Sequence, residues 1–165
     1  MEITLAPFAP RDIRPLLEWN DGLGPDFLTQ WAGFGYSYPL TRGQVTDKLD
    51  AQGAAKYLVF ALRAEKRTVG TLELNFLNVP AGCATLCRFL IAPEQRLRGL
   101  GAKALRAAEA YARERLGLDT LLLKVFEYNR IAVSCYKRAG FDIRRIVTHQ
   151  NGLPMLEMEK RITHA

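Results

Sequence analysis

The chain has 165 residues, of which 48% are hydrophobic and 24% charged, and it carries a formal net charge of +6. This length and composition indicate one globular domain with a substantial core, and they exclude a disordered chain. No stretch approaches the roughly 18 consecutive apolar residues that cross a bilayer, and the first residues do not resemble a signal peptide, so we expect a cytoplasmic protein with no membrane partner.

The cysteines Cys83, Cys87 and Cys135 are an odd and sparse set, unlike the disulfide framework of a secreted protein. The only two histidines, His149 and His164, lie far downstream of the first two cysteines. This spacing is not that of a zinc site, so the sequence implies no metal.

The N-terminal third of the chain predicts a short strand and three helices. Residues 3–8 alternate weakly between apolar and polar, which favours a strand. Asp12 stands where it can cap a first helix, and residues 26–31 predict a second. Thr41 and Gln44 have the spacing of a capping box, so a third helix should begin there.

A hydrophobic period of two marks the region that follows, as is typical of strands. Three strands joined by short turns, an antiparallel meander, are expected over residues 57–63, 68–77 and 84–92. A helix over residues 102–116 then leads to the apolar run 121–126. Because a crossover of this length forms a βαβ unit, the run should lie parallel to the strand before the helix.

The C-terminal region carries local signals for a helix and a hairpin. Asn129 stands where a helix cap is needed, residues 131–139 continue as a helix, and Gly140 supplies the left-handed residue that ends it. Asn151-Gly152 is a strong hairpin signal. The predicted fold is therefore of the α/β (α+β) class: a mixed, largely antiparallel β-sheet flanked by helices, with one parallel pair after a βαβ crossover, in a single domain.

The loop before the long helix has the features of a phosphate site. A strand that leads directly into a helix leaves backbone N–H groups without partners at the helix start, and such groups bind anions. Gly99 and Gly101 let a phosphate approach the main chain, while Arg96 and Arg98 add positive charge. The P-loop pattern is absent, and Ala104 replaces the third glycine of the dinucleotide fingerprint, so we expect a pyrophosphate site of another kind.

Basic residues are concentrated around this loop. Residues 88–115 include seven lysines and arginines and three acidic residues. A polyanionic ligand explains this excess of positive charge, although part of the excess belongs to a solvated helix face. Nucleic acid is a disfavoured partner, because no DNA- or RNA-binding signature appears and the basic residues flank glycines rather than aromatic residues.

Two segments together resemble the GNAT superfamily of N-acetyltransferases. Arg96, Gly99 and Gly101 match its acetyl-CoA loop, Gln/Arg-x-x-Gly-x-Gly/Ala. A second family pattern is matched downstream by Val125, Asn129, Ala132, Tyr136, Gly140 and Phe141. The resemblance implies a GNAT-like fold, acetyl-CoA as co-substrate, and transfer of an acetyl group to a primary amine. It covers roughly residues 56–161, the cofactor-binding core with the C-terminal hairpin, and leaves residues 1–55 as acceptor-side helices.

The resemblance also implies which residues bind acetyl-CoA. The diphosphate would lie against the loop residues Arg96, Leu97, Arg98, Gly99, Gly101 and Ala102. The strand before the loop would bulge and splay from its parallel neighbour, so that main-chain groups hold the pantetheine arm and thioester at Phe89, Leu90 and Ile91. Asn129, a helix cap on sequence grounds, would also contact the cofactor or a water molecule.

Direct attack on the thioester requires a neutral amine, and a lysine-like amine has a pKa of about 10.4, so a base or a water leading to one must remove a proton. Glu73 is our candidate base, although its strand register equally allows a solvent-side salt bridge; Glu127 and a water chain are alternatives. Tyr136 matches the position that in many relatives protonates the leaving thiolate. A covalent cysteine mechanism is less attractive, because neither Cys87 nor Cys135 has a histidine near it in sequence.

Acceptor choice is expected to depend on residues 20–40 and on the hairpin around Asn151. Several aromatic residues there are candidates for the wall of an amine pocket: Trp19, Trp31, Phe34, Tyr36 and Tyr38. The N-terminal region is loosely similar to branches that modify ribosomal-protein N-termini and aminoglycosides, so the acceptor is either a protein N-terminus or a small-molecule amine. A non-catalytic acetyl-CoA sensor is the alternative, and the sequence leaves a homodimer open.

Overall fold

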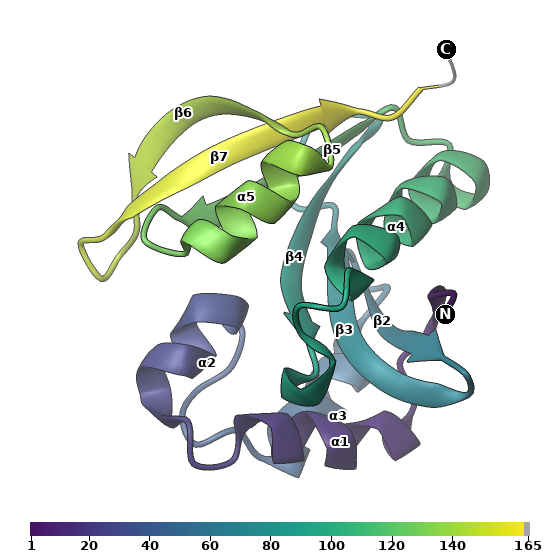
Figure 1. Ribbon diagram of the computed structural model, residues 1–165, viewed down its shortest axis with the longest axis vertical. Coiled ribbons are helices and arrows are strands. Elements are labelled where there is room, and N and C mark those ends of the chain that lie inside the picture. The colour runs from purple at the N-terminus through teal and green to yellow at the C-terminus, as the bar shows by residue number, and fades with distance from the viewer. Residues whose placement is uncertain (164–165) are drawn as a thin grey trace.

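The computed structural model describes residues 1–163, and His164 and Ala165 lie outside the described residues. A seven-stranded sheet in the order β1-β2-β3-β4-β5-β7-β6 is flanked by helices (Figure 1). All strand pairs are antiparallel except β4 and β5, which confirms the predicted fold class.

The strands are β1 (Thr4–Pro7), β2 (Tyr57–Ala64), β3 (Arg67–Asn75), β4 (Cys83–Ile91), β5 (Thr120–Phe126), β6 (Asp142–Thr148) and β7 (Pro154–Arg161). The helices are α1 (Ile13–Asn20), α2 (Gly24–Ala32), α3 (Arg42–Ala51), α4 (Leu100–Leu116) and α5 (Arg130–Arg138), with short 3-10 turns at Pro10–Asp12 and Pro93–Gln95.

The sheet separates two hydrophobic cores. Strand alternation sends Leu72 and Leu74 of β3 to the face covered by α4 and α5. The opposite face is covered by the N-terminal helices, which contribute Leu16, Leu28 and Val45. Side chains that point from the middle of β3 and β4 to this second face therefore lie under α1, α2 and α3. Among the described residues, no helix has the length and apolar character that crossing a lipid bilayer requires.

Asp12 is not the helix cap that its position suggests. Its side chain makes no capping hydrogen bond to α1. The carboxylate is fully buried, accepts hydrogen bonds from the Ala9 amide at 2.8 Å and from Arg63 Nη2 at 2.9 Å, and is also bonded by the Thr68 hydroxyl. It therefore joins the N-terminal segment to β2 and β3. The pattern of a capping residue gives no information about such distant partners.

The two other predicted caps are present. Thr41 Oγ1 accepts a hydrogen bond from the Gln44 amide at 3.3 Å at the start of α3, although the Gln44 side chain bonds Ser37 and Pro39 instead of completing the capping box. Asn129 Oδ1 accepts from an amide in the first turn of α5. These local motifs depend on residues close together in the chain, which is why the sequence predicts them.

The end of α5 fixes the position of Tyr136. Gly140 has φ of +97°, as the predicted left-handed end requires, and the Phe141 amide donates to the Tyr136 carbonyl at 3.0 Å. This is the hydrogen bond of a Schellman motif. The hairpin signal is also confirmed, since β6 and β7 pair on either side of Asn151-Gly152.

Candidate active site

Strand β4 contains a bulge where it passes β3. Between the pairs Thr71–Leu90 and Glu73–Cys87, two residues of β4 lie opposite one residue of β3, and the first of the two is Arg88. Arg88 has φ of +47°, a left-handed conformation that is uncommon outside glycine and clusters at functional sites. The extra residue lets Arg88 point to the same face as Cys87 and Glu73, and its Nη1 contacts both side chains.

Beyond its first residues, β4 also separates from its parallel neighbour. The β4–β5 pairing begins at Cys83 and ends at Thr85, which lies beside Leu122, whereas β4 continues to Ile91. The end of β4 is therefore paired with β3 only. The main chain from Phe89 onwards therefore makes no ladder hydrogen bonds to β5. Its polar groups on that side are available to a ligand, as we expect for a strand that holds a thioester arm.

The loop between β4 and α4 presents a row of amides. Within the described part of the chain, the backbone N–H groups of residues 97–102 donate no hydrogen bond of standard geometry to a protein group. Helix α4 begins at Leu100, two residues before the predicted start, so Gly101 and Ala102 lie in its first turn, while Gly99 at the N-cap has φ of +74°. These amides lie at the positive end of the helix, an arrangement that is suited to bind an anion with several oxygen atoms.

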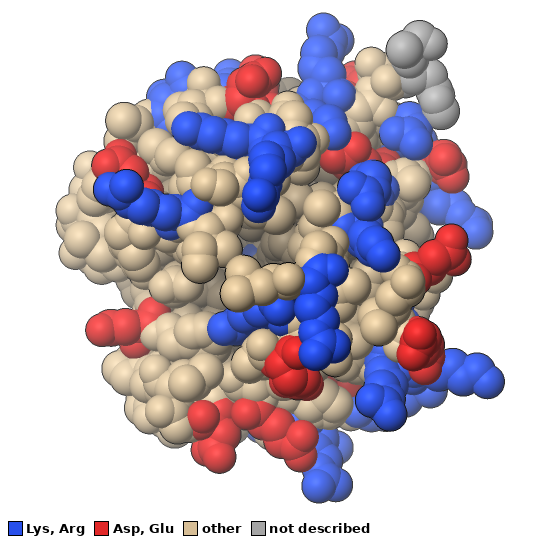
Figure 2. Space-filling view, viewed as in Figure 1, with Lys and Arg blue, Asp and Glu red and all other residues tan. Residues whose placement is uncertain are grey.

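Charged side chains around the loop have different roles. Arg96 Nε donates to the Ile91 carbonyl at 3.2 Å, and its guanidinium lies 5.4 Å from the centroid of the Phe27 ring, so Arg96 ties the loop to β4 and α2. Arg98 and Leu97 are exposed, and Leu97 has φ of +61°. Lysine and arginine side chains border the hollow in the middle of this face of the molecule (Figure 2).

Helices α4 and α5 approach each other beside the loop. A Cβ atom at Gly101 would lie 3.4 Å from the Sγ atom of Cys135, an ordinary van der Waals contact, so the two helices are close at this point. Asn129 precedes α5, and its Oδ1 is occupied by capping. The second lone pair of Oδ1 and the amide NH₂ group are left for the contact with the cofactor or water that we predict.

Tyr136 is buried beneath the bulged strand. Its ring centroid lies 6.4 Å from that of Phe89 and 6.0 Å from that of Phe141. Burial, and next the nearby Cys135 and Cys87, raise the pKa of the Tyr136 phenol above its ordinary value. A raised pKa disfavours complete proton transfer to a thiolate, so the hydroxyl is better suited to donate a hydrogen bond.

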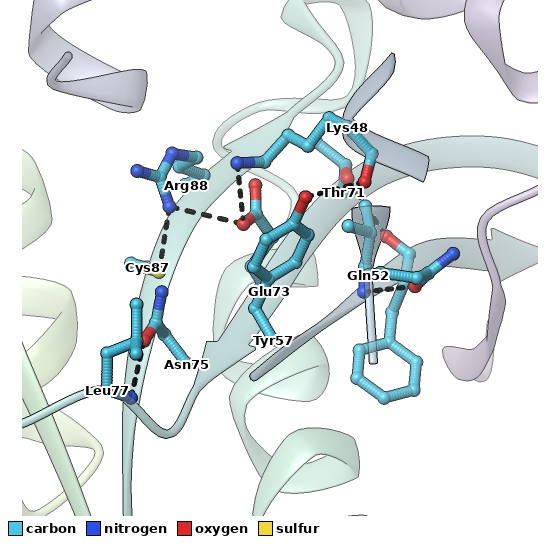
Figure 3. Close-up of polar contacts among 11 residues, drawn as sticks. Lys48, Gln52, Tyr57, Thr71, Glu73, Asn75, Leu77, Cys87 and Arg88 are labelled. Carbon is cyan, nitrogen blue, oxygen red and sulfur yellow. Dashed lines mark hydrogen bonds and ion pairs between the residues drawn. The ribbon is translucent and has the colours of Figure 1, made fainter. Parts of the chain in front are cut away.

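Glu73 is the centre of a buried ionic cluster (Figure 3). The strand register places its side chain under the N-terminal helices, where it is 2% exposed, rather than in a solvent-side salt bridge. Its Oε1 accepts from Arg88 Nη1 at 3.1 Å and lies 3.3 Å from Lys48 Nζ of α3. The same ammonium group lies 4.5 Å from the Tyr57 ring centroid and 5.4 Å from that of Tyr36. With all three groups ionised, the cluster carries one excess positive charge.

Burial controls the protonation of this cluster. It raises the pKa of the Glu73 carboxyl, although Arg88 and Lys48 oppose the shift, and it lowers the pKa of Lys48. Burial and the Glu73 charge raise the pKa of the Cys87 thiol to about 12. At neutral pH Cys87 is a thiol and not a thiolate, which gives a covalent cysteine mechanism no support.

Glu127, the other carboxylate that we considered as a base, lies elsewhere. It is exposed, follows β5, and bonds the Pro154 carbonyl through its amide at 3.0 Å. It lines a hollow between α5 and the β6–β7 hairpin rather than the Glu73 cluster. Among the described residues, no group of three or more His, Cys, Asp and Glu side chains is placed to hold a metal ion.

The predicted acceptor region is divided between core and surface. Trp19, Trp31 and Tyr36 are buried, whereas Phe34 and Tyr38 are exposed. The Phe34 ring stacks on His149 of the β6–β7 loop at 4.8 Å, so the N-terminal region contacts the hairpin. A hollow of about 370 Å³ lies between the α1–α2 turn and residues 38–40.

Sequence reasoning missed Lys48 and Tyr57 and did not give Arg88 a role in the site. Lys48 lies in a polar stretch of α3, where a lysine is normally solvated, and its contact with Glu73 exists only in the folded chain. Arg88 was visible as a basic residue in an apolar strand. That contrast is the one signal in the sequence that marks it.

A family model described as "Acetyltransferase (GNAT) family" matches residues 25–141 of the chain. The match includes the loop before α4, the bulged strand and all of α5. The match begins at residue 25, whereas the resemblance based on the sequence motifs begins near residue 56.

Solved structures of similar fold include two kinds of N-acetyltransferase. Spermidine N-acetyltransferase from Vibrio cholerae, in complex with CoA and spermine, has 18% identity and a TM-score of 0.81, with coverage of 97% of this chain and 95% of that one. AAC(6')-Ib, in complex with paromomycin and acetyl-CoA, has 20% identity and a TM-score of 0.80, with coverage of 98% and 94%. At these identities the similarity establishes the fold.

Proposed function

Because the chain belongs to the acetyltransferase (GNAT) family, we propose that it transfers an acetyl group from acetyl-CoA to a primary amine by direct attack in a ternary complex. The proposal is carried by the backbone amides of residues 97–102, which lie beside the splayed end of β4 and donate no hydrogen bond of standard geometry to any described residue. The amides suit a diphosphate, and the strand end suits the thioester arm of the same molecule. The acceptor is either a protein N-terminus or a small-molecule amine.

Glu73 is proposed as the base, acting directly or through a water molecule. Both cations contact its Oε1, while Oε2 accepts no hydrogen bond from a described residue. Burial raises the pKa of the Glu73 carboxyl and so brings it closer to neutral pH than the pKa of an exposed carboxyl, which favours action as a general base. Oε2 takes the proton of the ammonium group, which frees the nitrogen lone pair for attack.

The bulged strand is proposed to polarise the carbonyl group. Main-chain N–H groups near Leu90 would donate hydrogen bonds to the thioester carbonyl oxygen as negative charge develops on it. Because the strand already holds these groups in place, no rearrangement of the protein is needed. Acetyl-CoA supplies an activated acyl group: as the new C–N bond forms, the C–S bond breaks and its electron pair leaves on sulfur. The Tyr136 hydroxyl donates a hydrogen bond to that sulfur. The attacking nitrogen loses a second proton as it becomes an amide, and the sulfur takes up a proton and leaves as free thiol.

Substitution of Tyr136 with phenylalanine is expected to lower kcat by about tenfold to a hundredfold while Kd for acetyl-CoA stays within about twofold. The ring packing against Phe89 and Phe141 is retained, so only the hydroxyl is lost. Steady-state rates and calorimetry measure the two quantities. Tyr111→Phe is the matched control, because Tyr111 packs edge-on against Phe60 in the core. Equal kcat in both variants would rule out the role.

The proposed activity is tested by the release of free thiol from acetyl-CoA in the presence of peptides, polyamines, amino acids and aminoglycosides. We expect thiol release that depends on one class of amine, with a matching increase in the mass of the acceptor. Tight binding of acetyl-CoA without thiol release from any amine would instead indicate a non-catalytic sensor.

A further inference from the structure

The cluster of Glu73, Lys48 and Arg88 contains two cationic side chains and one carboxylate. Glu73 is the single carboxylate that forms an ion pair with Lys48 or Arg88 within residues 1–163. Two cations share this one carboxylate, so with all three groups ionised one positive charge has no counter-ion among the described residues. The side chains are not sealed, because Lys48 is 12% and Arg88 21% exposed. An anionic group that enters the site would complete the cluster.

Arg88 has hydrogen-bond donors to spare. A guanidinium has five N–H donors, and the hydrogen bonds of Arg88 within the described residues all come from Nη1. Gly35 leaves room for the group, since a Cβ at that position would lie only 1.8 Å from Arg88 Nε. The planar group is therefore held in place with Nη2 unused, and its geometry matches a carboxylate.

The positions of Glu73 and Arg88 indicate that the reacting amine and a negatively charged group of the same substrate would lie close together. Arg88 directly precedes Phe89 and the strand end that we assign to the thioester, and Glu73 offers its unused Oε2 on the same face. An amine that gives its proton to Glu73 therefore lies beside Arg88. A carboxylate on the same small molecule can reach the guanidinium.

On the basis of the proposed function, we propose that the acceptor is a small amine with a carboxylate close to its amino group, as in a free amino acid, and that Arg88 and Lys48 bind this carboxylate. A polyamine or an aminoglycoside would instead add positive charge to a cluster that already has an excess. A peptide N-terminus lacks the adjacent carboxylate. Arg88 is in this account a specificity-determining residue.

The first test compares glycine and each of the L-amino acids that have a primary amino group with its own carboxamide in the thiol-release assay. For the accepted side chain, kcat/KM for the acid should exceed that for the amide by at least about tenfold. The comparison is stringent, because the amine of the amide is less basic and more of it is neutral at a given pH. Equal or better use of the amides, or a preference for spermidine, would overturn the proposal.

The second test measures how Arg88 affects this preference. Arg88→Gln should reduce the acid-to-amide ratio by about tenfold, Arg88→Lys should keep part of it, and Arg144→Gln in an exposed ion pair should leave it unchanged. A ratio of two substrates does not depend on the folded fraction of the variant. An unchanged ratio in Arg88→Gln would contradict the assignment.

Calorimetry with the CoA-bound protein separates this proposal from the proposed catalysis. If amino acids bind in an Arg88-dependent way but no thiol is released, the carboxylate site stands and the catalytic proposal fails. If amines are acetylated with no preference for a carboxylate, the catalytic proposal stands and the carboxylate site fails. If neither binding nor turnover occurs with any probe, both fail.

Discussion

Replacement of Gly101 with aspartate is expected to weaken the binding of acetyl-CoA by at least about a hundredfold, equivalent to about 2.7 kcal/mol, without lowering the melting temperature. Gly101 is in the first turn of α4, where the helix dipole stabilises a carboxylate. The new side chain would therefore favour the helix, while its negative charge, close to the amides that we propose bind the diphosphate, would repel the diphosphate. Loss of binding could not then be attributed to unfolding.

Gly101→Ala is the matched control for this variant. Its Cβ would lie 3.4 Å from Cys135 Sγ, an ordinary contact, and it adds no charge. The alanine variant should keep Kd for acetyl-CoA within a fewfold of the parent protein, as measured by calorimetry, and thermal unfolding should be similar in all three proteins. If the aspartate variant binds as well as the alanine variant, the amides of this turn do not hold the diphosphate.

Substitution of Glu73 with glutamine is expected to lower the free energy of unfolding by about 2–3 kcal/mol and kcat by at least about a hundredfold. The change removes the one negative charge that both Lys48 and Arg88 contact, and leaves two cations together in a buried place. Removal of one partner from a fully buried pair costs more, about 3–5 kcal/mol, but Lys48 and Arg88 are partly exposed and their charges are partly screened by solvent.

Glu159→Gln is the control for the charge change. Glu159 pairs with Arg144 on the surface at 3.5 Å, and both side chains are largely solvated, so we expect a loss of less than about 0.5 kcal/mol. Urea unfolding gives the stabilities, and steady-state kinetics give kcat. If Glu73→Gln loses stability but keeps its turnover, Glu73 anchors the two cations and the proton leaves by a water chain. If both values stay unchanged, the cluster has neither role.

The parts of the site that sequence reasoning predicts are those built from neighbouring residues. The glycine loop, the Asn129 cap and the Gly140 helix end each follow from a spacing of a few residues, and the structure contains all three elements. The predicted start of α4 was two residues late, because Leu100 reads as part of an irregular loop until the left-handed Gly99 defines the N-cap.

The parts that it does not predict depend on long-range contacts. Alternation in β3 shows that Glu73 and Leu72 face opposite sides of the sheet, but it cannot say which side lies under α4 and α5 and which lies under the N-terminal helices. The family resemblance implies a bulge in β4, but nothing in the sequence shows that the bulge turns Arg88 towards Glu73, and Lys48 reaches the cluster from a helix that is distant in the chain. Asp12 illustrates the same limit, since its partners Arg63 and Thr68 replace the local cap.

The central claim is that the main-chain amides of residues 97–102 bind the diphosphate of acetyl-CoA. Assigned ¹H–¹⁵N correlation spectra recorded during a titration with CoA test it most directly. We predict that these six amides move downfield together as hydrogen bonds to phosphate form, while Gly152 in the β6–β7 loop stays unchanged. CoA that binds without moving these amides, or that does not bind at millimolar concentration, would contradict the claim.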